Sequence, residues 1–125
     1  MRITLGVTGG VAAYKAAELV RRLKQDAFNV QVVITRGARG ASYLGDDERF
    51  DVRAPAVEAV DTTGAGDVFA GVLAAEWLAG HEHALRRACA AGALSTLVPG
   101  AGDCAPYAEA IDDAVSNRKA GDRHL

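Results

Sequence analysis

Two glycine-containing segments of this chain carry residue types that could bind phosphate. Residues 5–15 read LGVTGGVAAYK, and residues 61–69 read DTTGAGDVF. Each segment places glycines where a predicted strand runs into the N-terminus of a helix, an arrangement that exposes backbone N–H groups and binds anions. In the first segment Gly9 and Gly10 would let a phosphate approach the backbone, and Thr8 could add a hydroxyl donor. The alternative is that these glycines only permit close packing of the helix on the strand.

The second segment is the more specific of the two. Gly64, Ala65 and Gly66 would present consecutive N–H groups at a helix start, which suits the charge that develops on a transferred phosphoryl group. Asp67 follows on the first turn, where its carboxylate could accept a proton from an attacking hydroxyl. The alternative role for Asp67 is to interact with the positive end of the helix dipole without taking part in chemistry. This segment therefore predicts descent from a phosphoryl-transfer site.

The composition narrows the classes of function. Of the 125 residues, 50% are hydrophobic and 24% are charged, so we expect one folded α/β domain over residues 1–117 and a polar tail at 118–125. The net charge is −2 and no basic stripe is present, which argues against nucleic-acid binding. Cys89 and Cys104 lack metal-ligand spacing, and the apolar stretch at 68–79 is too short to cross a bilayer. We expect a soluble, cytoplasmic protein without a membrane partner.

The spacing of apolar residues predicts the elements that must position these segments. Residues 2–8 and 30–35 are apolar runs typical of buried strands, and 11–25 has helical spacing, so together they predict a parallel βαβ unit. Residues 41–44 and 49–57 flank a turn signal and predict antiparallel strands beside that pair. Three later helices are predicted, at 66–78, 81–97 and 106–117. The expected fold is a three-layer α/β sandwich with a mixed sheet, the first helix on one face and the later helices on the other.

Residues 1–38 resemble the opening βαβ unit of the flavin-dependent phosphopantothenoylcysteine decarboxylase family. The resemblance implies that Thr8, Gly9 and Gly10 receive the phosphate of FMN, and that Thr35 after the second strand faces the flavin. The catalytic histidine and the Asn-containing flavin motifs that follow in that family have no counterparts in this sequence. We therefore expect no decarboxylation.

Residues 32–117 resemble the C-terminal part of ribokinase-like, or PfkB-type, sugar kinases. The strings that carry this resemblance are TRGARGASYLG, DTTGAGDVFAGVLAAEWLAG and AGALSTLVPGAG. The resemblance implies that Gly64, Ala65 and Gly66 form the anion hole and that Asp67 descends from the catalytic base.

The same resemblance implies two further contacts. Thr35 and Gly37 would approach the phosphates of ATP, and Asp61 together with the carbonyl of Thr63 would contact a monovalent cation. The sequence departs from the kinase pattern at Arg36, which stands where that family has a small or apolar residue.

The two resemblances overlap at residues 32–38, where both families place a buried strand that ends in threonine. We therefore expect an engineered chimera, with a decarboxylase-like unit over 1–35 and a kinase-like hairpin and helices over 36–117. A natural fusion is the alternative origin. Because the sugar-binding half of the kinases has no counterpart, we expect no efficient catalysis and no required cofactor. The alternatives are a module that binds ATP, ADP, FMN or phosphate, and a weak ATP-dependent carbohydrate kinase. Surface left uncovered by the truncation predicts a homodimer.

Overall fold

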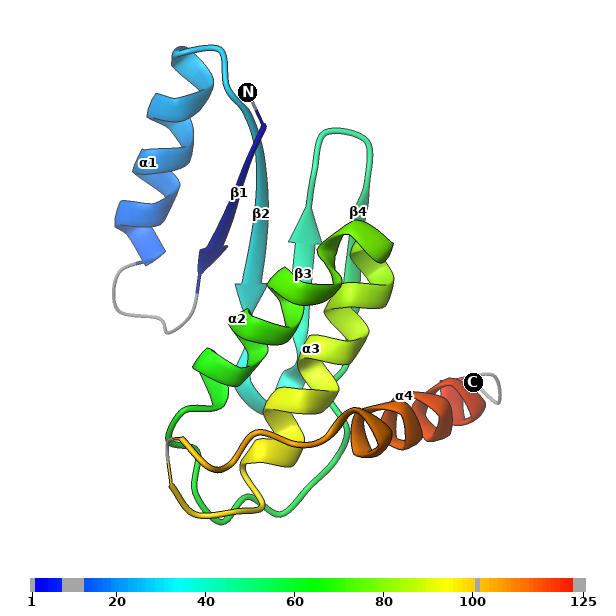
Figure 1. Cartoon of the computed structure of the whole chain (residues 1–125). Coiled ribbons are helices and arrows are strands. Elements are labelled where there is room, and N and C mark those ends of the chain that lie inside the picture. Colours follow the sequence, from blue (N-terminus) through cyan, green and yellow to red (C-terminus); the bar gives the residue numbers. More distant parts are fainter. Residues whose placement is uncertain (1, 8–12, 101, 123–125) are drawn as a thin grey trace.

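The computed structural model describes residues 2–7, 13–100 and 102–122 (Figure 1). The strands in this part of the chain are β1 (Arg2–Val7), β2 (Asn29–Thr35), β3 (Ala41–Leu44) and β4 (Arg49–Val52). The α-helices are α1 (Ala13–Gln25), α2 (Ala65–Glu76), α3 (His81–Ser95) and α4 (Ala108–Asp122). Two short 3-10 helices are η1 (Gly37–Arg39) and η2 (Trp77–Ala79). Among these helices, none is both long enough and apolar enough to span a membrane.

The strands form one mixed sheet in the order β1-β2-β3-β4. β1 pairs with β2 in parallel, while β3 and β4 are added as antiparallel strands. The predicted βαβ unit and mixed sheet are therefore confirmed. The last strand is shorter than predicted, because β4 ends at Val52, and α4 continues beyond the predicted helix end at residue 117.

The two faces of the sheet are covered by different helices. Register places Val33, Tyr43 and Phe50 side by side on the face where α2 and α3 pack. Figure 1 shows α1 beside β1 and β2, apart from α2 and α3. On β1, the residues of the α2–α3 face are exposed: Arg2, Thr4 and Gly6. The residues that alternate with them are half-buried on the α1 face: Ile3, Leu5 and Val7.

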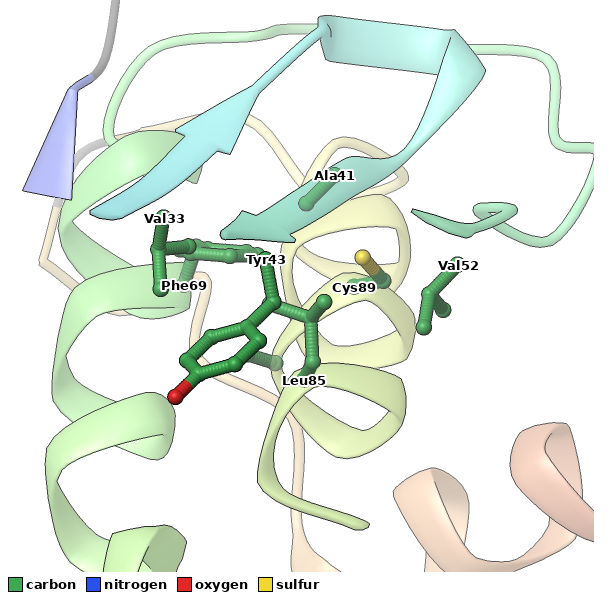
Figure 2. Packing of buried hydrophobic residues seen from close by; sticks show 8 residues of the cluster. Val33, Ala41, Tyr43, Val52, Phe69, Leu85 and Cys89 are labelled. Atoms are coloured by element: carbon green, nitrogen blue, oxygen red, sulfur yellow. The ribbon is translucent and has the colours of Figure 1, made fainter. Parts of the chain in front are cut away.

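The main hydrophobic core lies between α2, α3 and strands β2 to β4, as Figure 2 shows. Leu85 of α3 and Val33 of β2 are fully buried at its centre. The other buried members of this cluster are Ala41, Tyr43, Val52, Phe69, Ala88 and Cys89. A second cluster joins α3 to α4 through Ala90, Ala91 and Ile111. The kinase-like part of the chain therefore holds both of these clusters, apart from the contribution of β2.

The side of the sheet that faces α1 is less completely buried. The sequence predicts that Leu19, Val20 and Leu23 all meet the sheet, but Leu19 is 45% exposed and that part of the prediction is wrong. Val20 and Leu23 are half-buried, as is Ala16, so the inward face of α1 follows the spacing 16, 20 and 23. Leu19 lies at the margin of this face.

Leu85→Ala should lower the free energy of unfolding by about 2–5 kcal/mol, because a fully buried leucine loses its apolar contacts and leaves a cavity. Leu23→Ala should cost less, since Leu23 on the inward face of α1 is only half-buried. Chemical denaturation followed by circular dichroism measures both variants. Equal losses of stability would contradict the unequal burial on the two faces of the sheet.

Candidate functional site

The site is built around the start of α2. Gly64 caps this helix with φ +80°, a left-handed conformation that glycine adopts without the steric strain of a side chain. The Ala65 N–H donates a 3.2 Å hydrogen bond to the Thr62 carbonyl, which closes the turn before the helix. The Val68 N–H donates to the Gly64 carbonyl at 3.0 Å, and this is where regular helical bonding begins.

The backbone amides of Gly66 and Asp67 precede that first helical bond, so they belong to the helix end that a ligand can occupy. Apart from its chain neighbours and the backbone of its own helix, a Cβ added at Gly66 would have no atom within 4 Å. Close packing by other parts of the described chain therefore does not explain the glycine at this position. The open space beside Gly66 fits the approach of a ligand to the helix end. Asp67 is exposed on the same turn.

Asp61 holds the loop before α2 against the loop after α3. Its carboxylate accepts hydrogen bonds from the Thr63 N–H at 2.9 Å and from the Gly100 N–H at 3.1 Å. The N–H groups of Val60 and Asp61 both donate to the Thr96 carbonyl. Hydrogen bonds from the Thr63 hydroxyl and N–H, and then from the Gly100 N–H, hold the pKa of Asp61 below its usual value. The carboxylate predicted to contact a cation is thus also a clamp between two loops.

The turn after β2 lies at the same end of the sheet as the start of α2, as Figure 1 shows. The Thr35 hydroxyl donates a 3.4 Å hydrogen bond to the Val7 carbonyl, which joins the ends of the two parallel strands. Gly37 has φ +58° and open space where a Cβ would be. Gly40 is required sterically, because a Cβ there would lie 1.9 Å from the Val52 carbonyl oxygen. The backbone of this turn is therefore held close to the end of β4.

Arg36 holds this turn in a way that the sequence did not reveal. Its guanidinium donates to the Ser42 hydroxyl and lies 3.1 Å from the Asp51 carboxylate, which also accepts a 2.5 Å hydrogen bond from Ser42. Ser42 is on β3 and Asp51 is opposite it on β4. The signal in the sequence was the departure of Arg36 from the kinase pattern, and in the structure this side chain joins the turn after β2 to β3 and β4.

The remaining predicted residues are placed as follows. Thr8, Gly9 and Gly10 lie outside the described residues. Within residues 2–7, 13–100 and 102–122, no three His, Cys, Asp or Glu side chains are grouped so that they could hold a metal ion. Cys89 is buried in the main core, and desolvation raises the pKa of its thiol to about 12, so this thiol stays protonated.

Known proteins resemble the chain in two ways. A family model described as pfkB family carbohydrate kinase matches residues 5–108. Ribokinase of Arabidopsis thaliana is 39% identical over 75 residues, which cover 57% of this chain and 20% of that protein. The coenzyme A biosynthesis bifunctional protein CoaBC of Vibrio vulnificus (strain YJ016) is 55% identical over 38 residues, which cover 30% of this chain and 10% of that protein.

The fold has its own relatives among solved structures. The structure of Arabidopsis thaliana ribokinase complexed with ribose and ATP matches with a TM-score of 0.72 and 25% identity. The match covers 90% of this chain and 40% of that one. The chain thus spans well under half the length of these relatives, and the part that it spans has the same architecture.

Asp61→Asn should make the stability of the fold less sensitive to acid. The folded state lowers the pKa of Asp61 below its ordinary value of 3.8, so the ionised carboxylate stabilises the fold above that pH. This stabilisation is lost as the pH falls through the lower, folded-state pKa. We expect the denaturation midpoint of the wild type to fall more steeply than that of the variant between about pH 5 and about pH 2. Parallel curves would mean that the clamp between the two loops contributes nothing.

Proposed function

Because the chain belongs to the pfkB family of carbohydrate kinases, we propose that it binds the phosphates of ATP or ADP at the N-terminus of α2. The observation that carries this proposal is the open space in front of Gly66, beside backbone amides that no helical bond uses. The ribokinase structure that contains ribose and ATP supports it, because that structure is similar over 90% of this chain.

The residues predicted from the kinase resemblance each have a role in this proposal. Gly64 and Gly66 shape the anion hole, and the Ala65 N–H joins it when its 3.2 Å bond to the Thr62 carbonyl opens. Thr35 and Gly37 approach the nucleotide phosphates from the turn after β2.

A monovalent cation beside this loop is part of the same proposal. It would contact Asp61 and the carbonyl of Thr63. The Asp61 carboxylate can coordinate the cation only through the oxygen lone pairs that are not used in its hydrogen bonds from the Thr63 and Gly100 N–H groups.

Asp67 is the proposed general base, because it is exposed on the first turn beside the anion hole. A base at this place takes the proton of an acceptor hydroxyl as the hydroxyl attacks the terminal phosphoryl group. Most of the rate in such a reaction comes from holding the acceptor in line with that group. Since the chain spans 40% of the ribokinase structure, we propose that by itself it binds nucleotide but transfers phosphate to sugars inefficiently.

We further propose that the chain is composite, with its opening βαβ unit related to the decarboxylases and the rest to the kinases. The 55% identity to CoaBC over 38 residues supports the first relationship. The kinase-like structure of 90% of the chain supports a graft in which one βαβ unit replaced another of the same shape. A sequence tree of residues 1–38 that places them among the kinases would contradict this origin.

Gly66→Ala should weaken ATP and ADP binding by roughly 10–100-fold, because the new methyl group shields amides whose hydrogen bonds to an anion contribute about 1.5–3 kcal/mol. The same change should leave the fold as stable or more stable, since the methyl meets no other atom. Calorimetric titration and thermal unfolding measure the two effects.

Gly71→Ala is the matched control for this experiment. It lies on the same helix, also faces open space, and should stabilise the fold while nucleotide affinity stays unchanged. If the two variants bind ADP equally well, phosphate does not bind at the start of α2. A parallel titration with FMN tests the alternative ligand. If FMN gives binding heat and ATP and ADP give none, the proposed site moves to residues 8–10.

Asp67→Asn should lower any ATP-dependent phosphorylation across a panel of sugars by about 10²–10⁴-fold, because it removes the proposed general base. ATP affinity should be retained, since the amides that bind phosphate remain. Steady-state turnover and calorimetry separate the two effects. Turnover that survives the substitution would assign the base role to another residue.

A further inference from the structure

The imidazole ring of His81 lies where three separate segments of the chain meet. His81 is the first residue of α3, and its ring stacks on the Trp77 indole of η2 with centroids 4.2 Å apart and planes at 19°. The phenol of Tyr43 on β3 contacts the same imidazole, with centroids 5.0 Å apart. Tyr43 is buried in the main core, so this ring stack joins the core to the bend at Gly80, which has φ +133°.

The Glu48 carboxylate, at the end of the turn between β3 and β4, lies 3.7 Å from Nδ1 of His81. This distance is too long for a hydrogen bond, so a neutral imidazole gains little from the contact. A protonated imidazole gains an ion pair with Glu48. It also gains a cation–π contact with the Trp77 ring, whose centroid lies within the range of that interaction. Both gains therefore depend on the same proton.

Other charged groups around the imidazole oppose this effect or have partners of their own. Arg2 lines the same open recess as Glu48 and His81 and would repel a protonated ring, but Arg2 is exposed to solvent that screens its charge. The positive end of α3 also disfavours a charge on His81. Burial, and then the charge of Glu48, raise the pKa of the Tyr43 phenol, so Tyr43 stays neutral while a histidine titrates. The remaining nearby charges are held in other ion pairs: Glu76 with His83 and Arg87, Glu82 with Arg86, and Asp46 with Lys24.

We propose that the contacts of His81 with Glu48 and Trp77 form a proton-controlled clasp, which holds the β3–β4 turn to the bend at Gly80 when the imidazole is protonated. Direct contact with a carboxylate and an indole face outweighs the screened charge of Arg2 and the end of α3. Because histidine is the side chain that titrates near neutral pH, the clasp tightens as the pH falls from about 8 to about 5.5. It lies beyond the end of α2 opposite to the candidate phosphate site and does not depend on nucleotide binding.

The first part of the test uses the fluorescence of Trp77, which is the only tryptophan in the chain. A protonated imidazole in contact with an indole quenches its emission more strongly than a neutral one. Emission of the full chain should therefore fall between about pH 8 and about pH 5.5, and His81→Gln should abolish this fall. His83→Gln is the matched control, because His83 faces Glu76, and it should leave the fall unchanged. Emission that is independent of pH, or a fall that survives His81→Gln, would overturn the proposal.

The second part tests the partner of the imidazole. Glu48→Gln keeps the size of the side chain and removes its charge, so the midpoint of the fluorescence change should move to lower pH. Asp46→Asn removes the same charge from the same turn, but Asp46 pairs with Lys24, so the midpoint should move less. Circular dichroism checks that both variants are folded. Equal shifts in the two variants would mean that Glu48 is not the partner of His81.

Chemical denaturation measures whether the clasp stabilises the fold. Glu48→Gln should reduce the folding equilibrium constant by about 2–5-fold more at about pH 5.5 than at about pH 8, because the ion pair exists only at the lower pH. In the His81→Gln background, the cost of Glu48→Gln should be the same at both pH values. A cost that is independent of pH when His81 is present would contradict the clasp.

Discussion

The close packing of α2 on α3 is the constraint on which the rest of the structure depends. A Cβ at Gly92 of α3 would lie 3.4 Å from the Ala65 carbonyl and 3.6 Å from the Cβ of Phe69. Because Ala65 is the first residue of α2, the start of the helix and its free amides lie close to the backbone of α3 at Gly92. Phe69, one turn later, enters the same core as Leu85 and Val33. The candidate site is therefore anchored by the best-packed part of the molecule.

β2 connects the two parts of the chain with different resemblances. Val33 on one face belongs to the core under α2 and α3, while Val30 is buried on the alternate face, toward α1. A strand buried on both faces tolerates little change of register, since a shift by one residue would exchange its two sets of side chains. This explains how a decarboxylase-like unit and a kinase-like unit can share one sheet if they agree at this strand.

Local pattern predicted most of the helices and strands of the fold. It predicted the mixed sheet and a helix from residue 66 with Asp67 on its first turn, and in the structure this helix begins at Ala65. It could not reveal interactions between distant segments. The bond from Gly100 to Asp61 joins residues 39 positions apart, and the Arg36 network depends on how β3 and β4 are paired. Leu19 was misassigned because apolar spacing alone does not tell which of two adjacent helix positions the sheet covers.

The central claim is that the start of α2 and the turn after β2 form one phosphate site. Titration of ¹⁵N-labelled protein with ADP, followed through the backbone amide resonances, tests it most directly. The account predicts saturable shifts concentrated at Gly64, Gly66 and Asp67 and at Thr35 and Gly37. Saturable shifts centred elsewhere, or no saturable shifts at millimolar ADP, would contradict it.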